Sequence, residues 1–154
     1  MEEAEEEEAE LGSVSTLSFI QANLQHSIAA SRIISRAVMV KGIDMALIQE
    51  PWYREDHVIG LNIPGYTLFH ASGIDRPRAC ILTRNETAWI LPGFSCRDLV
   101  AVLIKYKDRG AERRLVVCSA YLPYDSEHPP PSKELEEFVR YCENENLYLQ
   151  GLFN

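Results

Sequence analysis

The sequence predicts an α/β (α+β) fold in which mixed sheets are flanked by helices. Two strand–helix–strand segments, one near each end of the 154-residue chain, indicate parallel strand pairs. Between them lie short apolar runs separated by turn residues, which indicate antiparallel strands. We expect these elements to form a single domain with a buried core, because the length that remains after an acidic start suffices for one.

The charge is distributed unevenly. Residues 1–10 contain seven glutamates and no basic residue, whereas residues 11–154 carry 16 acidic and 15 basic residues, a net charge of −1. We therefore expect residues 1–15 to be an acidic disordered tail and residues 16–154 to form the domain. The near-neutral domain neither demands nor excludes a nucleic-acid partner. No apolar stretch reaches the length of a membrane span, so no membrane partner is expected, and the oligomeric state stays open.

The first strand–helix–strand segment is expected at residues 16–24, 28–41 and 44–49. Ser27 is a plausible helix N-cap, and apolar residues recur at helical spacing after it. Gly42 stands where a left-handed residue commonly ends a helix. Three elements joined by such short loops predict parallel pairing of the two strands.

The middle of the chain predicts an antiparallel meander, with strands at residues 67–70, 78–83, 88–91, 99–105 and 115–121. Its clearest hairpin turn is 107–110, and the apolar run 99–104 shows no alternation, which favours a central strand. A second helix is expected at 132–141, after three prolines, and a final strand at 147–150.

Cysteine and histidine spacing argues against a zinc site. The four cysteines lie 16, 22 and 24 residues apart, without a Cys-x-x-Cys pair, and the four histidines show no ligand spacing. Two of the cysteines lie in apolar runs, so reduced core thiols are expected.

The candidate functional residues lie at predicted strand ends. Glu50 follows a buried strand and precedes Pro51, where a carboxylate is either a solvated strand end or a metal ligand or acid/base. Parallel strands end at the same sheet edge, so Asn23 should lie near Glu50. In the same way, the parallel strands of the second strand–helix–strand segment should bring Tyr121 close to the 151–154 end. If the two units pack as a sandwich, all four sites face one cleft.

An amide, a carboxylate and a phenol at one edge suit a hard cation and a phosphate. Magnesium (or manganese) prefers oxygen ligands, commonly one or two carboxylates with water and substrate phosphate. The implied chemistry is metal-assisted phosphodiester hydrolysis. Each residue also has a structural explanation: Asn23 as a cap or turn residue, and Tyr121 as a strand-end aromatic.

Three short motifs carry a resemblance to a known family. They are Ile-Gln-Ala-Asn-Leu (20–24), Ala-Leu-Ile-Gln-Glu-Pro (46–51) and Ser-Ala-Tyr-Leu-Pro (119–123). In this order and at these intervals they resemble the endonuclease/exonuclease/phosphatase superfamily, which includes deoxyribonuclease I. The Gln-Glu-Pro-Trp form is most similar to endonuclease domains of insect non-LTR retrotransposons. The similarity spans roughly residues 17–154.

The resemblance implies a fold and residue roles. It implies part of a deoxyribonuclease I-like sandwich, with Glu50 as the metal-binding glutamate and Asn23 supporting the metal and phosphate site. Tyr121 matches the tyrosine against the scissile phosphate, and Asn154 the asparagine of a Gly-Asp-x-Asn motif. Arg78-Ala79 is a looser match to a strand entry. For the complete domain, the resemblance implies a DNA duplex partner, with an intracellular location that is nuclear if the protein is functional.

The sequence also departs from the family pattern. Gln25 and Tyr124 stand where the family commonly has Asp or Asn, and Leu152 replaces the aspartate of Gly-Asp-x-Asn. The later Ser-Asp-His segment is absent from this sequence. We therefore expect an N-terminal fragment of a magnesium-dependent DNA endonuclease domain with little or no activity. The ending at Asn154 is compatible with a faulty gene model, a decayed copy or an engineered protease-cleavage tag. Another phosphatase-type member and a non-catalytic interaction module are the alternatives.

Overall fold

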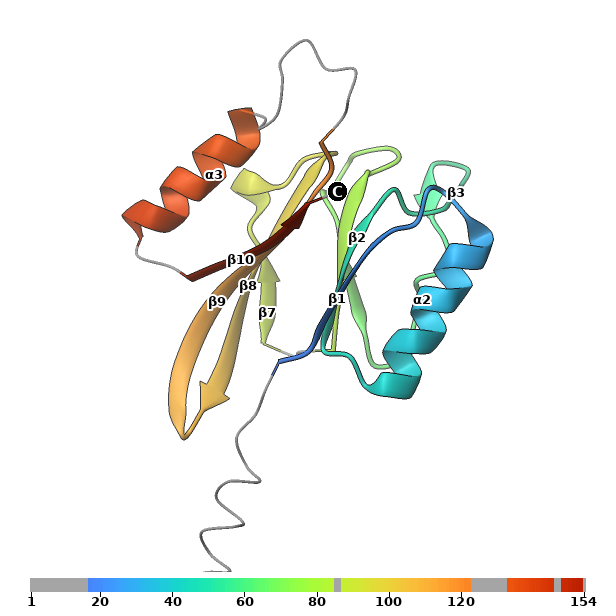
Figure 1. The fold of residues 1–154 in the computed structure, drawn as a ribbon. Helices are drawn as coiled ribbons and strands as arrows, with labels where there is room; N and C mark the ends of the chain where they lie inside the picture. The colour runs from blue at the N-terminus through green and yellow to red at the C-terminus, as the bar shows by residue number, and fades with distance from the viewer. Residues whose placement is uncertain (1–16, 85–86, 123–132, 146–147, 154) are drawn as a thin grey trace, which may run out of the picture.

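The computed structural model describes residues 17–84, 87–122, 133–145 and 148–153, which form a four-layered sandwich (Figure 1). Two four-stranded sheets pack face to face, and one helix covers the outer face of each. The predicted α/β class is confirmed. Neither helix among these residues is both long and apolar enough to cross a membrane.

The first sheet has the strand order β1-β2-β6-β5 and is covered by helix α2. Its elements are β1 (Phe19–Asn23), α2 (Ile28–Lys41), β2 (Met45–Gln49), β5 (Thr67–Phe69) and β6 (Ala79–Thr83). β1 and β2 are parallel, whereas β6 runs antiparallel to β2 and β5. The predicted helix has the expected bounds. Its Ser27 cap accepts a hydrogen bond from the Ala30 amide, and Gly42 is left-handed.

The second sheet has the order β10-β9-β8-β7. Its elements are β7 (Ala88–Ile90), β8 (Leu99–Asp108), β9 (Ala111–Ala120), α3 (Lys133–Asn144) and β10 (Tyr148–Phe153), with a 3-10 turn at Pro92–Phe94. β9 and β10 are parallel, which confirms the second strand–helix–strand unit. Arg109 and Gly110 form the β8–β9 turn with positive φ angles of 49° and 78°, as a two-residue hairpin requires.

The expectation of one continuous meander is wrong. β5 and β6 belong to the first sheet, whereas β7, β8 and β9 belong to the second. β6 already pairs with β2 on one side and β5 on the other, so β7 has no free edge there and the chain crosses to the other sheet. A short hairpin, β3 (Tyr53–Arg54) with β4 (His57–Val58), was not predicted.

The core has three parts, one between each pair of neighbouring layers. Alternate residues of β2 serve two of them: Met45 and Leu47 face the other sheet, and Ala46 and Ile48 face α2. The third lies under α3, where Phe138 is fully buried. Strands that are buried on both faces read as continuous apolar runs, which is why β2 and β6 show no alternation.

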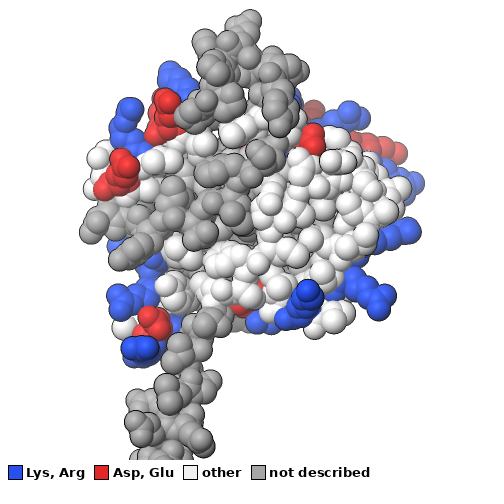
Figure 2. All heavy atoms as spheres, viewed as in Figure 1, with Lys and Arg blue, Asp and Glu red and all other residues white. Residues whose placement is uncertain are grey.

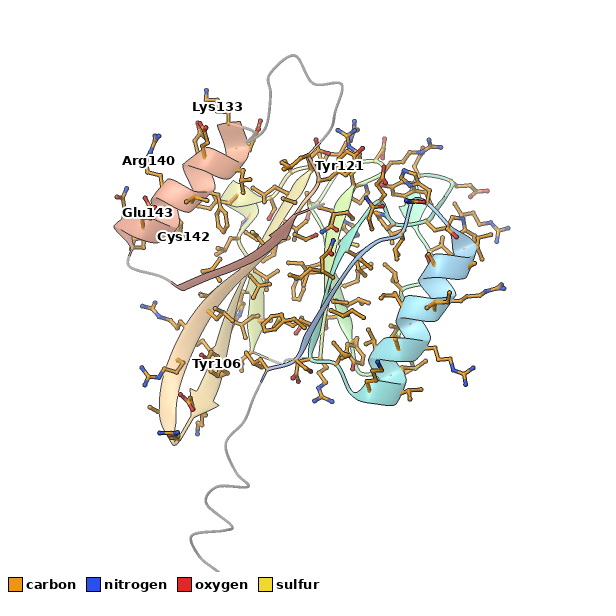
Figure 3. All side chains as sticks on the ribbon, in the orientation of Figure 1. Tyr106, Tyr121, Lys133, Arg140, Cys142 and Glu143 are labelled. Atoms are coloured by element: carbon orange, nitrogen blue, oxygen red, sulfur yellow. The ribbon has the colours of Figure 1, made fainter. Side chains whose placement is uncertain are left out.

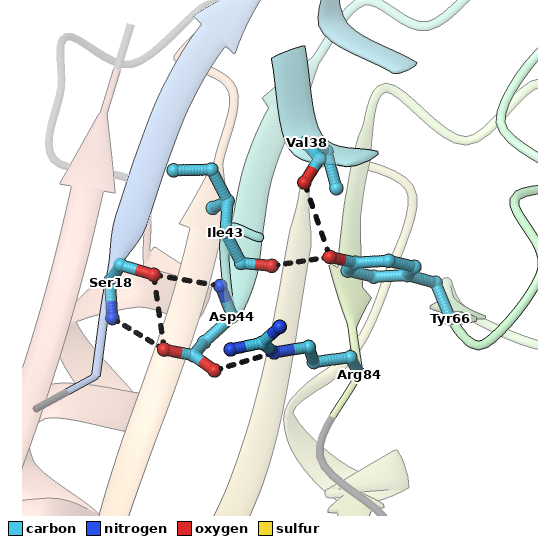
Figure 4. A network of polar contacts seen from close by, with 6 residues as sticks. All are labelled: Ser18, Val38, Ile43, Asp44, Tyr66 and Arg84. Atoms are coloured by element: carbon cyan, nitrogen blue, oxygen red, sulfur yellow. Dashed lines mark hydrogen bonds and ion pairs between the residues drawn. The ribbon is translucent and has the colours of Figure 1, made fainter. Parts of the chain in front are cut away.

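A polar network fixes the end of the first sheet where β1 begins (Figure 4). The Asp44 carboxylate accepts hydrogen bonds from the Ser18 amide at 2.8 Å and from Arg84 Nε at 2.8 Å. The Tyr66 hydroxyl donates to the Ile43 carbonyl at 2.7 Å. This network ties the start of β1 to the loop between α2 and β2, and it leaves the opposite end of the strands for the candidate site.

Candidate functional site

The predicted residues Asn23, Glu50 and Tyr121 lie at one edge of the sandwich. Asn23 is the last residue of β1, and Glu50 and Tyr121 each follow the last residue of their strands, β2 and β9. The two sheets are joined directly below this edge, since Gln49 Nε2 donates to Ser119 Oγ at 2.9 Å. The expected convergence of the two units on one edge is confirmed for these three residues.

Glu50 occupies a strained backbone position. Its φ angle is +47°, although the residue before a proline is normally extended. Two backbone hydrogen bonds hold it there: its amide donates to the Arg78 carbonyl, and its carbonyl accepts from the His26 amide, both at 2.9 Å. Its side chain is 20% exposed, and its carboxylate lies 3.7 Å from His26 Nε2. The carboxylate is therefore half-buried at the edge, and hydrogen bonds to the backbones of Arg78 and His26 fix the backbone of Glu50.

Asn23 forms a local turn beside Glu50. Its Oδ1 accepts a hydrogen bond from the Gln25 amide at 2.9 Å, which is the turn role foreseen as its structural explanation. Its strand partner is Gln49, and the next residue, Leu24, donates its amide to the Gln49 carbonyl at 2.9 Å. The turn thus runs alongside Glu50, and a carbonyl-type oxygen can still accept a second contact.

An ion pair absent from the sequence prediction connects Glu50 to Tyr121. Arg78, directly before β6, binds Asp98 through two hydrogen bonds of 2.5 and 2.7 Å. The Arg78 guanidinium lies 4.8 Å from the centre of the Tyr121 ring, and the Tyr121 amide donates to the Asp98 carbonyl at 2.8 Å. Figure 3 shows Tyr121 at this upper edge of the molecule. Arg78 therefore bridges the two sheets and supports the tyrosine ring.

Asp98 was missed because it precedes an apolar run rather than following one. β8 is antiparallel to β9, so it begins at the edge where β9 ends. Applying the same rule to antiparallel neighbours would have placed Asp98 beside Tyr121. Asn154 lies outside the described residues. Leu152 pairs in register with Ser119, so the backbone of β10 also reaches this edge.

An open cleft of about 490 Å³ adjoins the site. Arginine and ring side chains dominate its lining, together with one carboxylate: Arg76, Arg78, Arg97, His26, Trp52, Tyr53 and Asp75. The Tyr53 hydroxyl donates to the Pro77 carbonyl, and its ring centre lies 5.2 Å from that of His26. Burial raises the pKa of Tyr53, so this hydroxyl stays protonated. The cleft thus combines cationic groups with aromatic surface beside Glu50.

The side chains at the edge fit a hard cation only in part. Glu50 offers one carboxylate and Asn23 one amide oxygen, and magnesium can complete such a shell with water and phosphate. Asp98 accepts one hydrogen bond from Arg78 on each of its two oxygens, so its charge is already paired. In the described ranges no group of three His, Cys, Asp or Glu side chains is arranged to hold a metal ion.

Comparison with known proteins identifies the fold. No family model matches the sequence, and no curated protein matches it. The structure is similar to the endonuclease domain of TRAS1, a telomere-specific non-LTR retrotransposon, with 22% identity over 88% of this chain and 58% of that one, and a TM-score of 0.60. It is also similar to the mannosyl-6-phosphatase Bt3783 of Bacteroides thetaiotaomicron, with 14% identity over 88% of this chain and 64% of that one, and a TM-score of 0.56.

A third similar structure is D. rerio TDP2 complexed with single-strand DNA product, with 16% identity over 89% of this chain and 58% of that one, and a TM-score of 0.51. The chain spans less than two thirds of the length of all three. The resemblance carried by the three sequence motifs is thereby confirmed at the level of the fold. The chain has the deoxyribonuclease I-like fold of endonuclease/exonuclease/phosphatase structures.

Proposed function

We propose that this chain supplies the metal- and phosphate-binding part of a magnesium-dependent DNA endonuclease site of the retrotransposon type. The observation that carries the proposal is the meeting of Glu50, Asn23 and Tyr121 at one edge, beside a cleft lined by three arginines. The nuclease and phosphatase names among structures of the same fold support phosphate-ester chemistry.

Each residue has a role that its position supports. Glu50 and Asn23 would hold Mg²⁺ or Mn²⁺, which supplies charge stabilisation to a phosphate undergoing hydrolysis. The backbone bonds of Glu50 keep its carboxylate at the edge without reorganisation. Arg78 keeps the Tyr121 ring in place, so that the phenol can act as a hydrogen-bond donor to phosphate.

The cleft favours nucleic acid over a small phosphate ester. Three arginines spread along one opening suit a phosphodiester backbone, whose charges repeat along the strand. Aromatic side chains such as Trp52 offer surface to bases or sugars. The D. rerio TDP2 structure of the same fold contains single-strand DNA, which supports a nucleic-acid substrate class.

Leu152 limits the expected catalysis. At the β10 edge, leucine can neither accept a proton nor bind a cation, whereas the family motif has an aspartate there that acts on the attacking water. We therefore propose that this sequence binds a cation and DNA but hydrolyses DNA slowly or not measurably.

The first test measures cation binding by Mn²⁺ electron paramagnetic resonance in the presence of a short duplex. We expect one bound Mn²⁺ that is lost in Glu50→Gln and retained in Glu55→Gln. Glu55 is the matched control, because it is an exposed glutamate that also has a positive φ, 50°. Equal Mn²⁺ binding by Glu50→Gln would contradict the metal assignment.

The second test measures duplex affinity by fluorescence anisotropy and nicking of supercoiled plasmid. Arg97→Ala should weaken duplex binding severalfold and reduce its salt dependence by about one phosphate contact. Robust plasmid cleavage that Glu50→Ala abolishes would refute the inactivity but support the endonuclease. Hydrolysis of sugar phosphates without DNA binding would favour a phosphatase instead. A folded protein that binds neither Mn²⁺ nor DNA would be a non-catalytic module.

A further inference from the structure

A basic hairpin extends from the end of the sandwich opposite the candidate site (Figure 1). Figure 3 shows Tyr106, in this hairpin, at the lower end of the molecule and Tyr121 at the upper end. We call residues 105–114 the basic ribbon. It contains five basic residues and two acidic ones, a net charge of +3, in a domain that is otherwise slightly acidic. None of these residues takes part in the proposed function.

Three of the five cations of the basic ribbon lie on its outer face. Leu103 and Val116 of the same two strands contact the core under α3, and side chains two residues further along each strand share that face. This places Lys105 and Arg114, which are directly opposite each other in the register, on the outer face. Like charges at directly opposite positions destabilise a strand pair. A negatively charged ligand on this face would relieve that repulsion.

Within the basic ribbon, acidic side chains on this face are fewer than basic ones. Glu112 lies 3.6 Å from Lys105 and is the one acidic residue that shares the face within the ribbon. Lys107, opposite Glu112 in the register, adds a third cation to Lys105 and Arg114. Lys105 Nζ also lies 5.4 Å from the ring centre of Trp89, which is 48% exposed. In Figure 2 the region of the hairpin, at the lower left, shows more Lys and Arg than Asp and Glu.

A polyanionic segment of the same chain is attached at this end. Seven glutamates and no basic residue stand in residues 1–10. The chain enters the first sheet at Phe19, which packs on the same core cluster as Ile104, the residue before the ribbon. The nine residue-to-residue steps from Glu10 to Phe19 can span up to about 30 Å. The ribbon from Lys105 to its tip measures about 15 Å. The glutamates can therefore reach the whole ribbon.

We propose that the glutamate-rich segment, residues 2–10, binds in cis to the outer face of the basic ribbon. Its partners there are Lys105, Lys107 and Arg114, whose charge is opposite in sign to that of its seven glutamates. Attachment through a short linker gives the segment an effective concentration of about millimolar, so weak individual ion pairs suffice. The segment thereby competes with any other polyanion, nucleic acid included, for this end of the molecule. The proposal is independent of the metal and phosphate site.

Zero-length carbodiimide cross-linking of the full chain tests this contact. The reagent joins a glutamate carboxylate to a lysine amine in contact with it, and mass spectrometry locates the joined peptides. The chain has four lysines, Lys41, Lys105, Lys107 and Lys133, and the segment itself has none. Lys41 controls for reach, because it ends α2 close to Asp44, which binds Ser18 at the start of β1.

At low salt we expect about five times more cross-links from residues 2–10 to Lys105 and Lys107 than to Lys41. At about 0.5 M NaCl, where the screening length is shorter, the cross-linking yields at these lysines should become nearly equal. Arg114→Glu keeps both lysines but should remove most of the preference. Arg36→Glu, the same charge change at an exposed position of α2, should leave it intact. Equal cross-linking to Lys41, or a preference unchanged by Arg114→Glu, would overturn the proposal.

Discussion

The buried hydrogen bond between Gln49 and Ser119 offers the sharpest test of how the sandwich is held together below the candidate site. Gln49 is fully buried, donates to Ser119 Oγ at 2.9 Å and accepts from Gln21 Nε2 at 2.5 Å. Ser119 Oγ in turn donates to the Ile48 carbonyl at 2.8 Å. Replacing Gln49 with methionine keeps the length of the side chain but removes both of its hydrogen bonds.

The expected cost follows from these contacts. Each neutral hydrogen bond contributes about 1 kcal/mol net, so Gln49→Met should lower the free energy of unfolding by about 2 kcal/mol. The loss should not be much larger. Gln21 is half-buried and can turn to water, and Ser119 keeps its bond to Ile48. Ser119→Ala removes two hydrogen bonds of its hydroxyl, so it should also cost roughly 1 kcal/mol for each.

Urea unfolding followed by circular dichroism measures these differences. Both single variants remove the Gln49–Ser119 hydrogen bond, but the double variant loses this bond only once. The loss in unfolding free energy of the double variant should therefore be about 1 kcal/mol smaller than the sum of the losses of the two single variants. Thr67→Val, at an exposed position of the edge strand β5, serves as a control that should change stability by less than about 0.5 kcal/mol. Additive costs, or a neutral Gln49→Met, would show that the two sheets do not depend on this bond.

Four other features of the structure can be tested by substitution or labelling. Because the Glu50 backbone is left-handed, Glu50→Gly should be about 1 kcal/mol more stable than Glu50→Ala in urea unfolding, although both variants lose Mn²⁺ binding. Equal stability of the two variants would refute the backbone strain at Glu50. Arg78→Met should lower the free energy of unfolding by about 1–2 kcal/mol, because the side chains of the Arg78–Asp98 ion pair are only about 30% exposed. Arg76→Met breaks the more exposed ion pair with Asp56 and should lower it by less than about 0.5 kcal/mol. An alkylating reagent at about pH 8 should label the partly exposed Cys96 first, as mass spectrometry can show. Burial raises the pKa of Cys118 to about 12 and also raises the pKa of Cys80, so both thiols should react slowly. Early labelling of Cys80 or Cys118 would contradict this packing. Burial opposes ionisation of Asp44, but hydrogen bonds from Ser18 and Arg84 outweigh this effect and lower the pKa of Asp44 below 3.8. The ionised carboxylate therefore stabilises the fold above pH 3.8, and this contribution is lost as the pH falls through the lower folded-state pKa. Asp44→Asn should flatten the acid side of a plot of the free energy of unfolding against pH.

Much of the fold was predictable from local sequence. The helix Ile28–Lys41 carries its own start and stop signals in Ser27 and Gly42, and the structure confirms its bounds. The parallel pairing of β1 with β2 and of β9 with β10 follows from short connections through a helix. Because parallel strands end at the same edge, these local signals also placed Asn23 beside Glu50. Bringing Tyr121 to them depended on the two units packing as a sandwich.

The arrangement of the strands between the two units depended on competition for sheet edges. The sequence marks β5, β6, β7 and β8 as strands but does not show that β6 has both edges occupied, which sends β7 to the other sheet. The two-residue strands β3 and β4 are too short to show a period.

By itself, the sequence determined most of the elements, the two parallel units and the strand-end positions of Asn23, Glu50 and Tyr121, because helix caps, turns and apolar periodicity act between near neighbours along the chain. Only the tertiary structure revealed the Arg78–Asp98 pair, the arginine-lined cleft and the left-handed backbone of Glu50. These features join segments that are distant along the chain, whose contacts exist only after the sheets have packed. The physical reason is that a side chain's charge and a strand's direction are local properties, whereas a side chain's partner depends on which distant segment lies beside it.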